Sequence, residues 1–355
     1  MAELKTCKQC GVPKLVYKGL IWHGNGTITE AKDSDHRMLF CESDNLEALF
    51  AEIEKIIGIS IEKLIIESKG RVTREYLEKM IPAPMRKLIY TFKPSLIAEK
   101  MAVIAKAHGY GNVELVEIKR RSERGDYLIM TIEHPYSILF YRGDNMGGME
   151  AASGMEITVM VDMVDEDKYR LEMVVGTHPP ELKERLKPRT YPLKSGNIQL
   201  DRCPSCGVPL TVAAHHWDME TGVITNPGNG IRMALFGPNG LEAVFNELEG
   251  ELGESIPETI VEAQRRYTKE NFLVGEWLVG EENLRNMIAM RGLGVMTSYS
   301  VDENSLTLTI QNPCIIHIIV GIVKGLFEMV RGVDSTTHGW SISEDGDLTI
   351  TISTG

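Results

Sequence analysis

The sequence has no clustered stripe of lysine and arginine, no low-complexity tract and no leader-like apolar segment. Lys and Arg total 38 against 50 Asp and Glu, and the formal net charge of −12 argues against nucleic acid as a partner. The start, MAELKTCKQCG, lacks the apolar core of a signal peptide, so we expect a cytoplasmic protein. The most apolar stretch, Pro313 to Val330, carries Lys324 and Glu328 and is short for a membrane span. We expect a buried core helix there.

Cysteine is also scarce, and catalytic signatures are missing. Four of the six cysteines form two Cys-x-x-Cys pairs, which indicates metal ligation rather than a disulfide framework. No Ser/His/Asp grouping or pair of catalytic carboxylates stands out. The Gly-Asn-Gly triplets at Gly24 and Gly228 lack the Lys-Ser/Thr that follows a phosphate loop. We therefore favour a protein that is not an enzyme.

An internal repeat organises the chain. The segment Cys7-Lys-Gln-Cys10-Gly-Val-Pro recurs as Cys203-Pro-Ser-Cys206-Gly-Val-Pro. Three further blocks recur in the same order: Met38-Leu-Phe with Leu46-Glu-Ala-Leu-Phe, as Ala234-Leu-Phe with Leu241-Glu-Ala-Val-Phe; Gly58, Ser60, Glu67 and Thr73, as Gly253, Ser255, Glu262 and Thr268; and Pro135, Ile138, Gly143, Gly147, Glu150 and Gly154, as Pro313, Ile316, Gly321, Gly325, Glu328 and Gly332. Chance does not keep four blocks in order, so we interpret the chain as a tandem duplication.

The two halves predict two domains of the same kind. With 43% hydrophobic and 25% charged residues, 355 residues suffice for two globular cores. We place the first repeat at residues 1–176, a Pro-rich, basic linker at 177–201 and the second repeat at 202–355. Each repeat is expected to be α+β, with helices packed on an antiparallel sheet, and a pseudo-twofold axis is expected to relate them.

The pattern along the first half predicts its elements in order. Lys14 to Trp22 is expected to be a strand, and the 3.6-residue period from Leu46 to Ile57 predicts a helix that ends at Gly58. Further expected elements are helices from about Ile61 and after Pro94, a hairpin of Val113 to Ile118 with Tyr127 to Glu133, a helix begun by Pro135, and a hairpin of Ile157 to Val164 with Tyr169 to Val175. The second half repeats this order down to a hairpin that ends at Ile352.

The two Cys-x-x-Cys-Gly knuckles carry the strongest chemical signal. Each supplies two thiolates, and a closed tetrahedral metal site needs four. A pseudo-twofold would let Cys7, Cys10, Cys203 and Cys206 share one ion. The alternative is two separate sites, with His215 or His216 added to the second knuckle and His23 to the first, and unmetallated thiols are a third interpretation. Zinc is the expected ion. The knuckles also resemble those of rubredoxin, so iron stays open.

The end of the second half resembles a known family. The block Asn312-Pro-Cys-Ile-Ile-His317, with the glycines and glutamate that follow and a terminal hairpin, resembles the vinyl-4-reductase (hydrocarbon-binding) domain family. That family groups small-molecule-binding domains, relatives of a bacteriochlorophyll-biosynthesis protein and sensor domains of aromatic-responsive activators. It is similar in fold to subunits of a vesicle-transport tethering particle. The hairpin here keeps Gly346-Asp347 but lacks the family's cysteine pair, and the chain has no segment for the activators' ATPase or DNA-reading module.

The resemblance implies a pocket for a small hydrophobic or aromatic ligand. Cys314 and His317 are the candidate ligand-binding residues, and a satisfied core histidine beside a buried cysteine is the alternative interpretation. The leading hypothesis is a ligand-binding sensor or carrier with a structural metal site made of four cysteines. An accessory redox or cofactor-handling protein with a rubredoxin-like iron and a protein-interaction scaffold are the alternatives. A protein partner is compatible with each.

Overall fold

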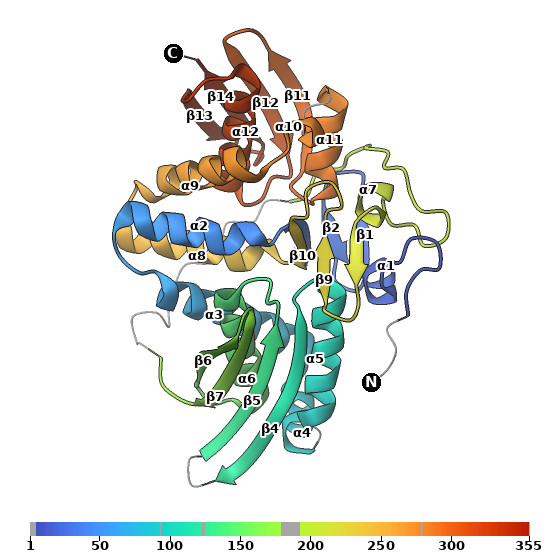
Figure 1. The fold of residues 1–355 in the computed structure, drawn as a ribbon, viewed down its shortest axis with the longest axis vertical. Helices are drawn as coiled ribbons and strands as arrows, with labels where there is room; N and C mark the ends of the chain where they lie inside the picture. The colour runs from blue at the N-terminus through green and yellow to red at the C-terminus, as the bar shows by residue number, and fades with distance from the viewer. Residues whose placement is uncertain (1–4, 93, 123–124, 179–191, 278–279, 355) are drawn as a thin grey trace.

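The fold was taken from a computed structural model that describes residues 5–92, 94–122, 125–178, 192–277 and 280–354. Helices and antiparallel sheets alternate along the chain, as the α+β prediction requires (Figure 1). The elements of the first half are α1 Lys14–Gly19, β1 Leu20–Trp22, β2 Ile28–Glu30, β3 Arg37–Glu42, α2 Asp44–Ile57, α3 Glu62–Met80, α4 Ala83–Phe92, α5 Pro94–His108, β4 Asn112–Ser122, β5 Gly125–Glu133, α6 Ile138–Ser153, β6 Ile157–Asp165 and β7 Lys168–Val175.

The second half has the same kinds of element in the same order. They are α7 Leu210–Ala213, β8 His216–Asp218, β9 Val223–Thr225, β10 Arg232–Phe236, α8 Pro238–Leu252, α9 Ile256–Asn271, α10 Val274–Trp277, α11 Glu281–Met290, β11 Val295–Val301, β12 Ser305–Gln311, α12 Ile316–Arg331, β13 Thr337–Ile342 and β14 Leu348–Ser353. The helices predicted from Leu46 and from Leu241 therefore hold corresponding positions, α2 and α8, in the two orders.

Three antiparallel sheets organise the molecule. The four-stranded sheets β4-β5-β7-β6 and β11-β12-β14-β13 have corresponding strand orders and lie at opposite ends of the long axis (Figure 1). Between them, both halves contribute three strands to one six-stranded sheet, in the order β1-β2-β3-β10-β9-β8. The two halves join where β3 pairs with β10 in antiparallel register, with Phe40 opposite Leu235.

The first long helix of each half packs on the other half. Helix α2 packs against α9, and α8 packs against α3, so that four helices stack in the order α9, α2, α8, α3 (Figure 1). Polar contacts follow the same exchange: Asn45 Nδ2 of α2 donates to Gln264 Oε1 of α9 at 2.6 Å, and Arg71 of α3 forms a 2.6 Å ion pair with Glu247 of α8. One hydrophobic core thus contains residues of both halves. The boundaries 1–176, 177–201 and 202–355 stay a prediction, and residues 179–191 of the linker lie outside the described residues.

Contacts between the halves come in matched pairs. Arg37 donates to the carbonyl oxygens of Gly292, Asn312 and Pro313, while Arg232 donates to those of His134 and Pro135. This pairing aligns Arg37 with Arg232, and hence Met38 with Met233. The sequence comparison had aligned Met38 with Ala234, one residue further along. When the two repeats are aligned, the one-residue gap therefore lies before strands β3 and β10 and not after them.

Glycine lets the helices under each end sheet approach closely. A Cβ at Gly147 of α6 would collide with the carbonyl oxygen of Gly70 on α3. In the second half, a Cβ at Gly325 of α12 would lie 2.8 Å from Cβ of Thr268 on α9. The repeated glycines thus serve helix packing in both halves. Such close packing leaves no room for a ligand between these helices.

Several elements differ from the sequence prediction. Lys14 to Gly19 is helical rather than extended, because Pro13 opens a turn whose carbonyl accepts from Val16 N and Tyr17 N. Helix α4 was not anticipated. Helix α6 begins after Ser137, whose side chain caps Phe140 N, and not at Pro135. Helix α12 is the buried core helix expected in the apolar stretch. Among the described helices, none is long and apolar enough to cross a membrane.

Candidate metal centre

Each knuckle is a tight turn that local hydrogen bonds hold closed. Cys7 N donates to Val12 O at 2.9 Å and Gly11 N donates to Cys7 O at 2.9 Å. In the second knuckle Cys203 N donates to Val208 O at 2.9 Å, and Gly207 N donates to Cys203 O at 2.8 Å. Gly11 and Gly207 have φ of 76° and 80°, a region that glycine enters without steric cost. The Gly of Cys-x-x-Cys-Gly is therefore required by the turn.

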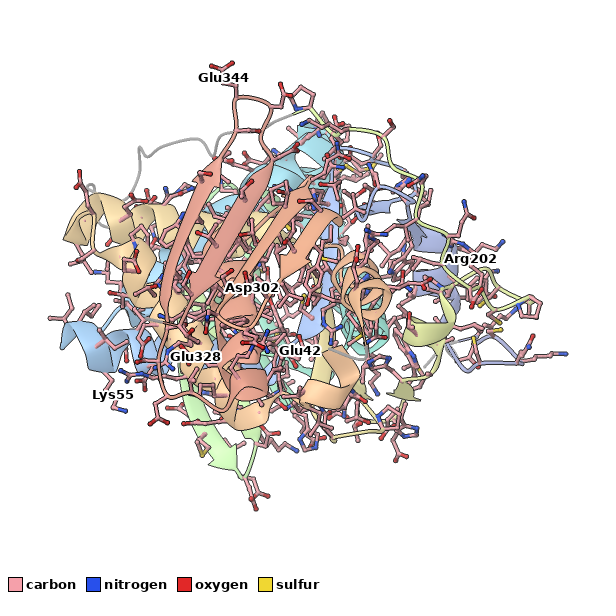
Figure 2. All side chains as sticks on the ribbon, turned by 90° about the horizontal axis from the view of Figure 1, so that it is seen from above. Glu42, Lys55, Arg202, Asp302, Glu328 and Glu344 are labelled. Atoms are coloured by element: carbon pink, nitrogen blue, oxygen red, sulfur yellow. The ribbon has the colours of Figure 1, made fainter. Side chains whose placement is uncertain are left out.

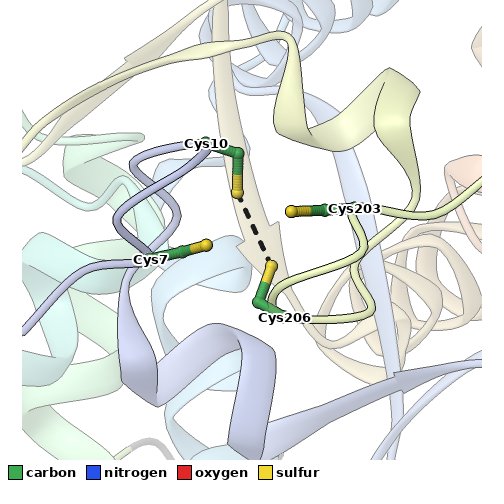
Figure 3. A group of neighbouring side chains, drawn as sticks. All are labelled: Cys7, Cys10, Cys203 and Cys206. Carbon is green, nitrogen blue, oxygen red and sulfur yellow. Dashed lines mark hydrogen bonds between the residues drawn. The ribbon is translucent and has the colours of Figure 1, made fainter.

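The structure brings the two knuckles together. The four Sγ atoms of Cys7, Cys10, Cys203 and Cys206 all lie within 4.8 Å of one another, and Cys10 Sγ is 3.5 Å from Cys206 Sγ. Figure 3 shows the sulfurs pointing toward one another from two loops that are far apart in sequence. A tetrahedral site with metal–sulfur bonds of about 2.3 Å places sulfurs about 3.8 Å apart. The arrangement therefore fits one shared metal ion.

The surroundings of the sulfurs suit a cation. The backbone N–H groups of Cys10 and Gln9 donate to Cys7 Sγ and lower the pKa of that thiol to about 6. Burial raises the pKa of Cys203, but hydrogen bonds from Ser205 N and Cys206 N outweigh it and lower the pKa. Burial raises the pKa of the Cys10 and Cys206 thiols. A bound cation would allow all four to be thiolates, because its charge offsets their mutual repulsion.

A small apolar core positions this site. It contains Val12 and Val16 beside the first knuckle and Val208 and Val212 beside the second, together with inward-facing residues of the six-stranded sheet. Cys10 and Cys206 pack against it. The strand pair β3 and β10 thus fixes the distance between the knuckles. No local sequence signal encodes that pairing.

The histidines of the alternative arrangement lie elsewhere. His23 Nε2 contacts Thr29 Oγ1 at 2.8 Å, His215 Nδ1 contacts Thr211 O at 2.9 Å, and His216 is exposed on β8. Within the described residues, the four cysteines are the one group of three or more metal-ligating side chains whose donor atoms all approach one another this closely. The geometry thus favours the shared site over two separate ones.

Cys314 and His317 lie around the start of α12. Cys314 precedes the helix, is buried and donates its thiol to Gly292 O at 3.6 Å. His317 packs edge-on against Trp340, with ring centroids 5.7 Å apart, and burial lowers the pKa of its imidazole to about 4. These two partners are different residues, and Cys314 and His317 are each adjacent in sequence to a residue that lines the cavity described next.

A cavity of about 20 Å³ lies where α2, α8 and α12 meet. Its walls are mainly apolar. One end is polar and is formed by Cys41, Glu42 and Asn45 of the first half. Asn45 is 8% exposed, and its Oδ1 lacks a hydrogen-bond partner among the described residues. The apolar walls are Leu46, Leu49, Phe236, Leu241, Leu293, Ile315, Ile318 and Ile322.

A buried ion pair borders this cavity. Arg291 is 1% exposed and contacts Glu42 Oε1 with its terminal nitrogen at 2.5 Å. Figure 2 shows Glu42 within the body of the molecule, whereas Lys55 and Glu344 lie at its rim. Sequence reasoning missed this pair. A signal was present, because Glu42 ends an apolar strand and the aligned residue of the other repeat is Gly237.

A second cavity is an open groove of about 900 Å³. It lies between residues 195–199 and the surface of α11 and β11, and polar side chains such as Glu282 and Arg285 line much of it. The knuckle cysteines, Cys314 and His317 are not part of it. Its wide opening gives it little power to enclose a ligand.

Comparisons with known proteins leave the family open. No family model matches the chain, and no curated protein matches it. Among solved structures, a Cs H-NOX mutant carrying 4-cyano-L-phenylalanine and a mutant of T. tengcongensis H-NOX are each 9% identical to the chain with a TM-score of 0.23. Each match covers 33% of this chain, and 72% and 73% of the respective H-NOX chains. A likeness of this size carries no argument about fold or function.

Proposed function

We propose that the chain is a non-enzymatic binding protein for a small hydrophobic or aromatic molecule, with its two repeats joined by a structural zinc ion. The observation that carries the proposal is the convergence of Cys7, Cys10, Cys203 and Cys206 from both repeats. A closed set of four thiolates leaves no open coordination position, which is the mark of a structural site rather than a catalytic one. The metal would therefore serve to hold the two repeats together.

The cavity at α2, α8 and α12 supports the ligand part of the proposal. Ligand sites combine apolar walls with a few orienting polar groups, and here Asn45 Oδ1 is a buried acceptor that awaits a donor. About 20 Å³ holds one water-sized group, so a larger ligand must displace flexible side chains. We propose that Cys314 and His317 act from the wall, since their chain neighbours Ile315 and Ile318 line the cavity.

Metal analysis of the purified chain tests the zinc. We expect one zinc per chain, and near zero in a Cys203→Ser/Cys206→Ser double variant. A Cys7→Ser/Cys10→Ser variant must lose the same equivalent, because both knuckles hold one ion. Two ions per chain, or a full equivalent retained in either variant, would contradict the shared site. A red protein with visible absorption would instead identify ferric tetrathiolate and favour the redox function.

Native mass spectrometry of the protein as purified tests the ligand. We expect a mass above that of the chain plus metal, lost on denaturation. An Ile318→Trp variant, which fills the cavity, should purify without the added mass. Val330→Trp is the matched control, because Val330 is 50% exposed at the far end of the same helix. Absence of added mass in the native protein would favour an interaction scaffold.

A further inference from the structure

Helix α4 presents a row of large apolar side chains to solvent. Met85, Leu88 and Phe92 are 53%, 57% and 72% exposed. Their spacing of three and then four residues places them on one face of the helix. Met101 and Ile104 of the neighbouring helix α5 are 49% and 37% exposed. Several exposed large apolar side chains on neighbouring helices are typical of a site of interaction with a protein or a membrane.

The same segment is basic, in contrast with the rest of the chain. Residues 83–106 contain five lysines and arginines against one acidic residue, Glu99, whereas the whole chain has a net charge of −12. Lys87 and Lys100 are exposed on α4 and α5. An apolar ridge accompanied by basic side chains complements an anionic surface with an apolar interior.

The duplicated scaffold does not need this surface. The corresponding helix of the second half, α10, spans only Val274–Trp277, and α11 begins with the acidic pair Glu281 and Glu282. Among the side chains described at this place in the second half, Leu273 is the one comparably exposed apolar residue, so no corresponding row is described there.

Shape and charge select among the partners that could cover the row. Neither of the two cavities described above is lined by a residue of α4 or α5. A second copy of the chain would bring two basic segments together, which like-charge repulsion opposes. A lipid bilayer accepts an exposed apolar row without a preformed groove.

We propose that α4 and α5 dock the protein on anionic lipid bilayers. The helices lie in the plane of the interface, Met85, Leu88 and Phe92 enter the apolar boundary, and Lys87 and Lys100 contact the headgroups. The apolar residues supply the insertion energy and the lysines the preference for anionic lipid. This surface is separate from the metal site and the cavity, so the proposal does not depend on either function.

Vesicle co-sedimentation of the full chain tests the proposal. The two probes are vesicles of phosphatidylcholine alone and vesicles in which about a third of the lipid is phosphatidylserine. We expect binding to the anionic vesicles and a decrease with added salt. A Leu88→Gln/Phe92→Gln variant should bind at least about tenfold more weakly. Replacing either Lys87 or Lys100 by Gln should weaken binding about fivefold, and only to the anionic vesicles.

A matched control separates this surface from general stickiness. Met163 and Val164 of β6 are 68% and 51% exposed, and a Met163→Gln/Val164→Gln variant should bind like the native chain. All variants change exposed side chains, and circular dichroism confirms their fold. Equal binding by the Leu88→Gln/Phe92→Gln variant, or no binding by the native chain, overturns the proposal. So does a native dimer that this variant converts to a monomer without affecting vesicle binding, because a second copy would then cover the row.

Discussion

The two halves bury a glutamate at the same position of corresponding helices, yet they neutralise it differently. In the second half Glu328 of α12 is fully buried, and its carboxylate contacts Arg265 at 2.6 Å and Lys269 at 3.1 Å. In the first half Glu150 of α6 is 4% exposed, and its partners are His178 and Arg74, the latter at 3.6 Å. Each half thus places one permanently charged cation beside the glutamate, Arg74 or Lys269. The second partner differs: it is the guanidinium of Arg265 in the second half and the titratable imidazole of His178 in the first.

This difference affects the start of the linker. His178 follows the last strand of the first half, and its ring bridges Glu150 and Glu67, with Nδ1 2.8 Å from Glu67. In the second half, Thr336 Oγ1, which lies between α12 and β13, donates to Glu328 at 2.9 Å. The repeated helices thus share a buried anion, while the chain segments that contact it differ between the halves.

A second difference lies between the halves. Glu42 pairs with Arg291 across the interface, and the aligned residues at the matching place are Gly237 and His108. Only one of the two related junctions therefore contains a buried ion pair. Substitutions at these places should affect the two halves unequally, and the largest effect is expected at the buried ion pair.

Arg291→Met should lower the free energy of unfolding by about 3–5 kcal/mol, because it leaves Glu42 buried without its cation. His108→Ala, at the matching place, should cost about 1 kcal/mol or less. Chemical denaturation measures both. A Glu42→Leu/Arg291→Met variant should recover at least half of the loss, and equal costs for Arg291→Met and His108→Ala would remove the asymmetry.

Gly147→Ala should cost about 3 kcal/mol, because its methyl group would overlap the backbone of α3. Gly325→Ala in the second half should cost less, about 1–2 kcal/mol, since its methyl group would lie 2.8 Å from the side-chain Cβ of Thr268 rather than still closer to backbone. Gly148 is the control: a methyl group there would meet Leu77 Cδ1 at 3.9 Å, so Gly148→Ala should stabilise by about 0.5–1 kcal/mol. If Gly147→Ala left the free energy of unfolding unchanged, the helices of the first half would be able to separate at little cost.

Arg37→Gln and Arg232→Gln should each cost about 2 kcal/mol, because each guanidinium donates charged hydrogen bonds to carbonyl groups of the other half. Thermal unfolding of the two variants and of their combination measures the effect. Similar single costs would support a balanced exchange of contacts. A much larger cost for one of them would show that a single junction dominates.

The smallest effect concerns pH. Burial lowers the pKa of His178, but the hydrogen bonds and charges of Glu67 and Glu150 outweigh it and raise the pKa above its ordinary value of 6.5. Stability from this cluster is therefore complete below about pH 6.5 and declines as pH rises through the folded-state pKa. We expect residues near His178 to become more sensitive to limited proteolysis between about pH 6 and pH 8.5.

His178→Gln should abolish that pH dependence, and Arg265→Gln in the second half should leave it unchanged, because an arginine does not titrate in this range. Proteolysis of the two variants at both pH values provides the comparison. A pH dependence that persists in His178→Gln would assign it to another group.

Local patterns in the sequence predicted much of the fold. The period from Leu46 to Ile57 and the glycine after it predicted α2, and Gly58 has the left-handed conformation of a helix C-cap. The two hairpins predicted in the first half are present, and only the predicted ends of their strands differ from the structure. The prediction of a strand from Lys14 was wrong. The helix there has only six residues, which are too few to distinguish a 3.6-residue period from the alternation of a strand.

The sequence by itself determined the repeat, most of the order of elements and the two pairs of metal-ligand candidates, because each follows from short patterns of neighbouring residues. The tertiary structure alone decided the exchange of α2 and α8, the meeting of Cys10 with Cys206 and the pairing of Glu42 with Arg291. These features join residues about 200 or more positions apart. Strand pairing and the burial of apolar helix faces bring these residues together. Neither interaction produces a characteristic spacing of residues that can be recognised in one sequence.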